Sequence, residues 1–233
     1  MIPGVDPEQW ALVAPALTLY AEEVHTLNRR FGLVAAADLG DPTGQRFFHR
    51  HILDSLLPWQ EVRALLRESG RRAIYDLGSG AGLPGVPLGL LLARDISETV
   101  LVERRSKRVT FLMGLLPRLS PPVSDAVIRV LEADAQTLRD HPDARPREAL
   151  VVFRAYQQTS ESLLAGLART FGPDTPVCAW KGQHHQAEEE LSLLKSSPFA
   201  RGAEIHRLVA PVAGPRENPP ERSLLTWYTS GSE

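Results

Sequence analysis

One stretch decides the fold of this chain: Ala73-Ile-Tyr-Asp-Leu-Gly-Ser-Gly-Ala-Gly-Leu-Pro-Gly85. It opens with a short apolar run and a carboxylate, passes through a glycine-rich turn, and leads into an apolar segment with helical character. This order predicts a strand, a tight turn and a helix. Glycines in such a turn adopt backbone angles that other residues avoid, and they let the main chain approach a ligand closely. The helix that follows can offer free N–H groups to a polar ligand.

Three kinds of nucleotide site compete for this turn, beside a purely structural turn. The string Gly80-Ala-Gly82-Leu-Pro-Gly85 matches the dinucleotide pattern G-x-G-x-x-G, so a nicotinamide oxidoreductase stays open. A P-loop needs Gly-Lys-Ser/Thr, which does not follow here. The third pattern, D-x-G-x-G-x-G, belongs to S-adenosylmethionine (SAM) sites and is complete. Its residues, with the next residue of the turn, are Asp76, Gly78, Gly80, Gly82 and Leu83.

A carboxylate is expected at the end of the next strand, where it can hold the two ribose hydroxyls of a nucleotide. The run Glu98-Thr-Val-Leu-Val-Glu103 is apolar and β-branched, and Glu103 ends it. NAD sites and SAM sites share this feature. Glu103 therefore supports a nucleotide cofactor without choosing between the two.

Strand and helix patterns alternate from residue 73 onward. Strands are expected near residues 73–77, 98–103, 126–131, 148–154, 175–180, 204–210 and 223–229, and helices near 84–93, 106–118, 160–170 and 185–195. This alternation predicts an α/β fold with a mostly parallel, doubly wound sheet. Ligands of such sheets bind at the carboxyl ends of the strands. The residues placed at that edge are Gly78–Gly82, Glu103, Asp134 and Arg154.

The first 70 residues lack strand patterns and predict a helical cap in front of the sheet. Pro15 lies inside the first helical pattern and is expected to kink or interrupt it. Two more helices are expected at about 45–57 and 59–68. We therefore divide the chain into an N-terminal helical cap, residues 1–70, and a domain that carries the SAM-binding pattern, residues 71–233.

The composition is ordinary for a soluble globular protein, with 43% hydrophobic and 23% charged residues and a net charge of −2. Since there is no overall positive charge, any nucleic-acid contact must come from local clusters. The single Cys178 excludes an internal disulfide and suits a reducing compartment. The N-terminus lacks the basic start of a signal peptide, and the longest apolar run is too short to span a bilayer. We expect a cytoplasmic monomer without membrane contact.

Two segments together carry a specific resemblance: Asp76-Leu-Gly-Ser-Gly-Ala-Gly-Leu-Pro-Gly-Val-Pro-Leu88 and Leu101-Val-Glu-Arg-Arg-Ser-Lys-Arg-Val-Thr-Phe-Leu112. They resemble the bacterial guanine-N7 methyltransferases of small-subunit (16S) rRNA, first named glucose-inhibited division protein B. The continuation Leu83-Pro84-Gly85-x-Pro87 and the tail Lys107-Arg108-x-x-Phe111-Leu112 distinguish this family from methyltransferases in general. The resemblance implies a Rossmann-like fold, SAM as cofactor, and small-subunit rRNA or an assembling small ribosomal subunit as partner.

Four more residues complete the predicted cofactor site. Asp134, Ala135 and Gln136 follow the third strand, where they can frame the adenine ring. The resembling family has Arg-x-Glu there, so a charge is missing at Gln136. Arg154 matches the Arg of the family's Ser-Arg-Ala segment, and its guanidinium can bind the cofactor carboxylate or an RNA phosphate. An exposed capping role for Asp134 and a structural ion pair for Arg154 stay open.

Cations on the substrate side form a second predicted set. Lys181 and Arg222 match family cations near the last strands, and His51 belongs to a His-x-x-Asp-Ser segment. With Arg154 they are the predicted substrate-binding residues, although solvated cations and a packing role for His51 stay open. The basic residues Arg104, Arg105, Lys107 and Arg108 either bind phosphate or form a solvated helix face. No metal site is expected, because His51 and Asp54 lack further clustered ligands.

Guanine N7 carries a free lone pair and no proton, so its methylation needs positioning rather than a general base. No catalytic residue is therefore predicted. Asn28 and Phe31 fit the family pattern, whereas Gly32-Leu33-Val34 replaces its Asn-Leu-Thr and lacks two polar groups. Three alternatives to guanine-N7 methylation stay open: a SAM-dependent methyltransferase for another RNA or a small molecule, a nicotinamide oxidoreductase, and an RNA-binding relative without activity.

Overall fold

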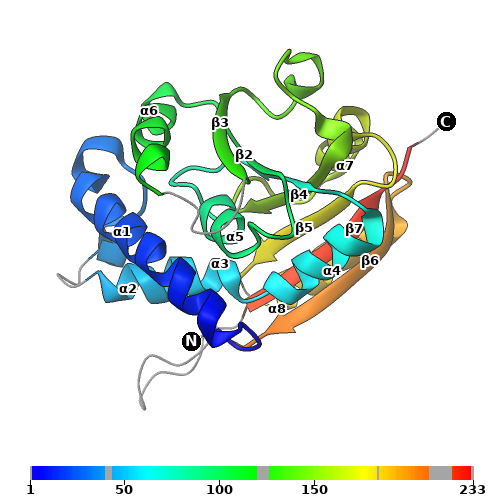
Figure 1. The fold of residues 1–233 in the computed structure, drawn as a ribbon. Coiled ribbons are helices and arrows are strands. Elements are labelled where there is room, and N and C mark those ends of the chain that lie inside the picture. The colour runs from blue at the N-terminus through cyan, green and yellow to red at the C-terminus, as the bar shows by residue number, and fades with distance from the viewer. Residues whose placement is uncertain (1, 40–43, 120–125, 183, 210–221, 232–233) are drawn as a thin grey trace.

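A computed structural model describes residues 2–39, 44–119, 126–182, 184–209 and 222–231. The chain folds into one seven-stranded sheet with helices on both faces (Figure 1). Along the described ranges, no helix is both long enough and apolar enough to cross a membrane.

The sheet has the strand order β3-β2-β1-β4-β5-β7-β6. The strands are β1 Ala73–Leu77, β2 Glu98–Glu103, β3 Val127–Glu132, β4 Ala149–Arg154, β5 Pro176–Lys181, β6 Ala200–Leu208 and β7 Arg222–Thr229. Strands β1 to β5 pair in parallel, and β7 is antiparallel to both β5 and β6. The predicted mostly parallel, doubly wound sheet is confirmed. Strand β6 begins before the expected residue 204, and residue 210 lies outside the described residues.

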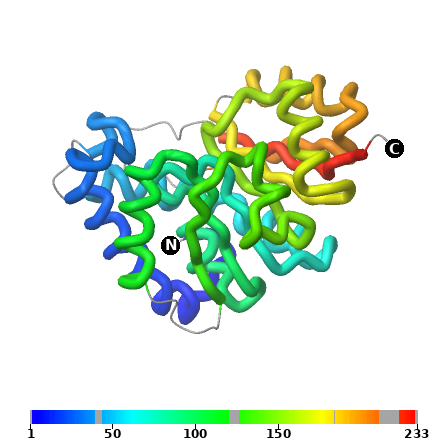
Figure 2. The backbone as a smooth tube through the Cα atoms, turned by 90° about the horizontal axis from the view of Figure 1, so that it is seen from above, coloured from blue at the N-terminus to red at the C-terminus, as the bar shows by residue number. Residues whose placement is uncertain are grey.

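Helices cover the two faces of the sheet separately. On one face lie α1 Pro7–Phe31, α2 Gln45–Phe47, the π-helix η2 Phe48–Leu53, α3 Asp54–Leu56, α4 Trp59–Ser69, α5 Gly85–Leu91 and α6 Ser106–Leu115. On the other lie α7 Glu161–Phe171 and α8 His184–Ser196. The short 3-10 helices are η1 Ala36–Leu39, η3 Leu116–Arg118, η4 Leu138–Asp140 and η5 Pro146–Glu148. Figure 2 shows the N-terminal helices, in blue, and the last strands, in orange and red, at opposite ends of the molecule.

The central strands are buried on both sides, as parallel strands between two helical layers must be. All five residues of β1 are buried. Ile74 packs into the core under the N-terminal helices, whereas its neighbour Tyr75 packs into the core under α7 and α8. Because successive strand residues face opposite sides, one short apolar run supplies both cores.

Helix α1 begins with Asp6 as its N-cap, whose Oδ1 accepts from the N–H groups of Glu8 and Gln9 at 2.7 and 3.3 Å. Of the kink or interruption predicted at Pro15, the interruption is wrong, since α1 continues through this residue to Phe31, and the kink stays a prediction. Pro15 is exposed, so the carbonyl group that loses its helical partner there can bind water. The buried face of α1 keeps the helix in place against the sheet domain.

The N-terminal helices share a hydrophobic core with the sheet. Leu17 and Phe47 belong to the same buried cluster as Ile74 and Leu112. The expected helix over residues 45–57 forms as one helical segment, α2-η2-α3, with π geometry in its middle. The division at residue 70 stays a prediction.

Candidate functional site

The strand order reverses beside β1, which pairs with β2 on one side and with β4 on the other. Ligands of doubly wound sheets bind outside the carboxyl ends of the strands at such a point. The glycine-rich turn leaves β1 at this edge, and the N–H groups of Gly78 and Ser79 both donate to Val102 O of β2, at 2.9 and 3.1 Å. The turn is thereby fixed to the end of the neighbouring strand.

Each glycine of the turn has a different reason to lack a side chain. Gly78, Gly80 and Gly82 have φ values of +67°, +61° and +102°, in the left-handed region that favours glycine. A Cβ on Gly78 would lie 2.4 Å from Cδ2 of Tyr156, and one on Gly82 would lie 2.7 Å from Cγ2 of Val86. Gly80 is more open, since a Cβ there would meet its nearest atom at 3.6 Å. Gly82 therefore serves packing, and Gly80 leaves space above the turn.

Asp76 lies at the base of the turn and is fully buried. Its Oδ2 accepts from Gly85 N at 2.9 Å, which fixes the start of α5. Its Oδ1 is buried and has no hydrogen-bond partner among the described residues. Burial raises the pKa of Asp76 to about 7, against the lowering effect of the Gly85 hydrogen bond. Asp76 thus organises the turn and keeps one acceptor oxygen unsatisfied.

Glu103 ends β2 with a side chain that is only 4% exposed. Its Oε2 accepts from Gly80 N at 3.0 Å, and its Oε1 accepts from Arg105 N at 2.9 Å. Arg108 Nη1 lies 3.6 Å from Oε2. These contacts hold the carboxylate against the glycine turn, and its ribose-binding role stays a prediction.

A cavity of about 260 Å³ opens beside the turn, and we call it the glycine-loop cavity. It is lined by Gly78, Val102, Glu103, Arg104, Arg105, Arg108, Ala133, Asp134, Ala135, Ala155, Tyr156 and Gln157. The predicted cofactor residues on its wall are thus Gly78, Glu103, Asp134 and Ala135. Gln136 lines a small adjoining cavity with Ala135. Asp76, Gly80, Gly82 and Leu83 form the turn without lining the cavity.

The side chain of Asp134 makes local contacts at the rim of this cavity. Its Oδ1 accepts from Gln136 N at 3.0 Å, and its Oδ2 lies 3.5 Å from Arg104 Nη1. The Asp134 side chain is 39% exposed, and Gln136 is exposed. A local turn-stabilising role for Asp134 is therefore present, and its adenine-binding role stays a prediction.

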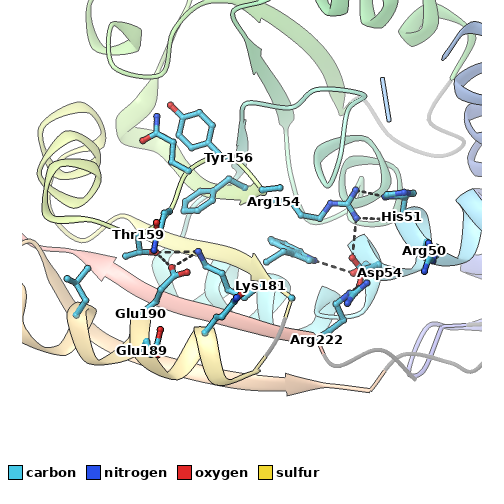
Figure 3. Close-up of a pocket in the computed structure, with 18 residues that line it drawn as sticks. Arg50, His51, Asp54, Arg154, Tyr156, Thr159, Lys181, Glu189, Glu190 and Arg222 are labelled. Atoms are coloured by element: carbon cyan, nitrogen blue, oxygen red, sulfur yellow. Dashed lines mark hydrogen bonds and ion pairs between the residues drawn. The ribbon is translucent and has the colours of Figure 1, made fainter. Parts of the chain in front are cut away.

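A second, larger cavity of about 1030 Å³ lies beside the ends of β4 and β5, and we call it the β4–β5 cavity. Figure 3 shows the residues that line it. All four predicted substrate-binding residues, His51, Arg154, Lys181 and Arg222, are among them. They come from the helical cap and from three different strands, so the fold brings distant parts of the sequence together here.

Asp54 of helix α3 binds two of these cations. Its Oδ2 lies 3.1 Å from Arg154 Nη1, and its Oδ1 lies 2.6 Å from Arg222 Nε. The backbone oxygen of Asp54 accepts from Trp180 Nε1 at 3.2 Å. The structural ion pair considered for Arg154 is therefore present, and Arg154 lines the β4–β5 cavity rather than the glycine-loop cavity.

His51 is the second partner of Arg154, whose Nη2 lies 2.9 Å from His51 Nδ1. Because a guanidinium only donates, Nδ1 accepts this hydrogen bond. Burial and the charge of Arg154 both lower the pKa of His51, against the raising effect of Asp38. His51 Nε2 lies 3.1 Å from Asp38 Oδ2. This histidine therefore orients Arg154 as a neutral acceptor.

Lys181 lies on another wall of the β4–β5 cavity and is paired. Its Nζ lies 2.5 Å from Glu190 Oε2 and 3.3 Å from Thr159 Oγ1. The Thr159 hydroxyl also donates to Glu190 Oε2. Lys181 is thus part of a polar group formed by β5, α8 and the segment before α7.

The two cavities share one wall, formed by Ala155, Tyr156 and Gln157 after β4. Ala155 has a φ of +51°, an unusual value for a residue other than glycine. The Tyr156 ring packs against Gly78 and makes an edge contact with Phe153 at 5.9 Å between centroids. Tyr156 therefore borders both cavities.

The donors and acceptors around the glycine-loop cavity fit a nucleoside cofactor. Glu103 supplies a buried carboxylate for ribose, Asp76 has an unsatisfied buried oxygen beneath the turn, and Gly80 leaves open space above it. Sites for drug-sized ligands have volumes of about 300–1000 Å³. The glycine-loop cavity is therefore large enough for part of such a ligand. The rest of the ligand would lie beside the shared wall at residues 155–157.

The basic cluster after β2 lies at the opening of the glycine-loop cavity. Arg104 and Arg108 pair with Asp134 and Glu103, and Arg105 and Lys107 are exposed. A phosphate-binding role for this cluster stays a prediction. Over the described residues, no group of three or more His, Cys, Asp or Glu side chains gathers that could hold a metal ion.

The polar lining residues absent from the predicted site include Asp54, Tyr156, Thr159 and Glu190. Asp54 did carry a signal, because it places a carboxylate inside the apolar run Ile52–Leu57, and a buried charge needs a partner. Glu190 carried none, since it follows two other glutamates on α8.

The fold, the glycine turn and the acidic end of β2 define a Rossmann-like, SAM-dependent methyltransferase. A solved structure with this fold, an O-methyltransferase from Bacillus cereus in complex with SAH, aligns with a TM-score of 0.51 and 16% identity over 90% of both chains. The sequence also matches a family described as GidB, rRNA small subunit methyltransferase G, over residues 14–216. The chain belongs to this family.

Two relatives illustrate the match, and both are named Ribosomal RNA small subunit methyltransferase G. The protein of Treponema pallidum (strain Nichols) is 34% identical over 187 residues, which cover 77% of this chain and 75% of the relative. The protein of Alkalilimnicola ehrlichii is 35% identical over 217 residues, which cover 92% and 83%. The predicted family, enzyme class and SAM cofactor are confirmed.

Proposed function

We propose that this protein transfers the methyl group of SAM to N7 of a guanine in small-subunit (16S) rRNA. One observation carries the proposal: the glycine-loop cavity and the β4–β5 cavity share the wall Ala155–Gln157. The first is bordered by the buried carboxylate of Glu103, and the second is lined by the cations Arg154 and Arg222. A nucleoside cofactor in the first cavity and an RNA base in the second would both lie next to these residues, and therefore close to each other.

When bound, SAM supplies a methyl group on a positively charged sulfur. The chain would hold it with the Glu103 carboxylate at the ribose and with the glycine turn, which Asp76 fixes in place. Asp134 and Ala135 would border the adenine. These residues bind and orient, and we assign none of them a proton transfer.

The β4–β5 cavity has the features that an unstacked RNA base and its phosphates require. Tyr156 lines it with a half-buried ring on which a base can stack, while the rings of Phe153 and Trp180 are buried. Arg154 and Arg222 supply charge for phosphate, and Asp54 holds both guanidinium groups in fixed positions. N7 lies on the Hoogsteen edge, which RNA exposes best when the base leaves the helix.

Positioning accounts for the chemistry, because N7 attacks with its own lone pair and loses no proton. Effective molarities in well-oriented reactions reach about 10⁵–10⁸ M. We expect the two adjoining cavities to accelerate methyl transfer in this way, by holding the two reactants in position. The substrate would be small-subunit rRNA, either free or within an assembling subunit, and the enzyme would act as a monomer. This substrate agrees with the cytoplasmic location expected from the sequence.

The test uses radiolabelled SAM and small-subunit rRNA from a strain that lacks the modification, followed by digestion to nucleosides. We expect label in 7-methylguanosine with the wild-type chain, and none with Gly80→Leu, because a side chain at Gly80 fills the space above the turn. Label in a different nucleoside would contradict N7 transfer. No label, with SAM still bound in calorimetry, would direct the search to another RNA or a small molecule.

A further inference from the structure

We propose that Glu190, held in place by Lys181 and Thr159, reads the Watson–Crick edge of the target guanine. This inference rests on the guanine-N7 function proposed above and adds the residue that selects the base. The three side chains form one polar group on the wall of the β4–β5 cavity, opposite the Asp54 cluster (Figure 3).

The contacts of Glu190 leave one of its oxygens available. Lys181 Nζ and the Thr159 hydroxyl both approach Oε2. Within the part of the chain that the structure describes, Oε1 accepts no hydrogen bond, and it is not buried away from solvent. The Glu190 and Lys181 side chains are only 16% and 12% exposed, so both are held rigidly while they line the cavity. A polar pair in this position has an ordered geometry before a ligand arrives.

The pair is complementary to guanine. The Watson–Crick edge of guanine presents two adjacent donors, N1–H and the N2 amino group, followed by the acceptor O6. The available Oε1 of Glu190 can accept from both donors, and the ammonium of Lys181 beside it can donate to O6. Adenine would place the lone pair of its N1 against Glu190 and its amino group against Lys181, so both contacts would be unfavourable.

The surroundings orient the base for the reaction. Phe153 lies under Lys181, with its ring centroid 6.0 Å from Nζ, and Tyr156 borders the same cavity. A guanine whose Watson–Crick edge meets Glu190 carries its N7 on the adjacent Hoogsteen edge, next to O6, where Glu190 leaves it free to react. The wall shared with the glycine-loop cavity, residues 155–157, borders the same cavity as Glu190 and Lys181.

Glu190 would also act on the charge that the reaction creates. The N7 lone pair forms the new bond to the methyl carbon, the electron pair of the broken carbon–sulfur bond stays on sulfur, and the positive charge passes to the purine. A carboxylate that accepts from N1–H stabilises this cation more than it stabilises the neutral base. Glu190 should therefore affect kcat as well as the choice of base.

The experiment first maps the methylated guanosine with the wild-type chain, and then replaces it by inosine through ligation of synthetic RNA. Inosine lacks the N2 amino group and keeps N1–H, O6 and N7. We expect the wild-type chain to lose about tenfold or more in kcat/KM on the inosine substrate. Glu190→Gln should lose about ten- to a hundredfold on guanosine, and its preference for guanosine over inosine should fall towards one.

Glu188→Gln is the matched control, because it makes the same change on the same helix at a side chain that is 57% exposed. It should keep both the rate and the preference. SAM affinity and the melting temperature of Glu190→Gln identify any loss of folding. If the wild-type chain methylates guanosine and inosine equally well, the inference about Glu190 is wrong and the proposed function stands. The same conclusion holds if Glu190→Gln keeps the preference for guanosine. Absence of label with the wild-type chain would instead overturn the proposed function, and the inference with it.

Discussion

Asp54 and Arg154 stand 100 residues apart in the sequence and join the helical cap to the sheet. The distance from Asp54 Oδ2 to Arg154 Nη1 is 3.1 Å, and the two side chains are only 9% and 17% exposed. The other oxygen of the same carboxylate binds Arg222. One acidic side chain thus positions two cations of the β4–β5 cavity, which makes Asp54 a positioning residue.

We predict that Asp54→Ala lowers the free energy of unfolding by about 3 kcal/mol, because it leaves partly buried guanidinium groups without a partner. Arg154→Ala should lower it less, since Asp54 keeps Arg222. The double variant should show a coupling of about 1–3 kcal/mol. Urea unfolding measures the free energy of unfolding of all three variants. In each variant, the rate of methyl transfer should fall by more than the loss of folded protein explains.

Asp174→Asn serves as the control for this cycle, because asparagine tolerates the left-handed φ of +60° at this position. Asp174 pairs with Arg201 on the surface, where the two side chains are 66% and 54% exposed. Such a pair contributes about 0–1 kcal/mol. Additive effects of Asp54→Ala and Arg154→Ala would mean that the two side chains do not depend on each other.

A second prediction concerns the contact between Gly78 and Tyr156. Gly78→Ala should destabilise the protein and weaken SAM binding, because the new Cβ would lie 2.4 Å from the Tyr156 ring at a φ of +67°. The left-handed angle alone costs about 1–2 kcal/mol. Adding Tyr156→Ala should recover the part of the loss that comes from the clash. Calorimetry measures the affinity for SAM, and urea unfolding measures the free energy of unfolding.

Gly114→Ala on α6 is the matched glycine control. It has a negative φ, and among the described residues no neighbouring atom lies within 4 Å of its added Cβ. We expect it to be neutral or to stabilise the helix by up to about 1 kcal/mol. If Tyr156→Ala fails to improve Gly78→Ala, the ring does not limit the space above Gly78.

The parts of the site that lie close together in the sequence could be predicted from it. The glycine spacing after β1 and the acidic end of β2 are local patterns, and the burial of their strands shows as continuous apolar runs. The start of β6 could not be predicted well, because a register shift between Arg201 and Glu204 interrupts the alternation and both side chains are exposed at the edge of the sheet. A half-exposed edge strand has a weaker sequence pattern than a buried one.

Contacts between distant residues could not be predicted. Asp54 meets Arg222 across 168 positions, and no local pattern relates them. Tyr156 covers Gly78 only because β4 lies next to β1. The continuity of α1 through Pro15 depends on packing that outweighs a local preference. Tertiary contacts decided each of these cases.

A third prediction concerns the contact between α1 and the glycine turn. Tyr20 is fully buried, and its hydroxyl donates to Ala81 O at 3.0 Å. Tyr20→Phe should lower the free energy of unfolding by about 1–2 kcal/mol, because a buried carbonyl loses its partner. It should also weaken SAM binding, since the turn loses a support. Tyr228→Phe, whose hydroxyl makes a 3.5 Å exposed contact, should change neither quantity. Equal effects of the two variants would contradict a specific role for Tyr20.

The last prediction follows from the buried carboxyl of Asp76. Its pKa is raised from 3.8 to about 7, so the folded state binds this proton more tightly than the unfolded state does. The resulting stabilisation is complete below the unfolded pKa of 3.8 and is lost as the pH rises through about 7. Asp76→Asn has no proton to lose and can still accept from Gly85 N–H.

The free energy of unfolding of Asp76→Asn should therefore fall less than that of the wild-type chain between the two pKa values. Urea unfolding across this pH range measures the difference, in which the contributions of all other groups cancel. Parallel profiles for Asp76→Asn and the wild-type chain would mean that Asp76 ionises in the folded protein as it does in the unfolded chain, and that its unsatisfied oxygen finds a partner in solution.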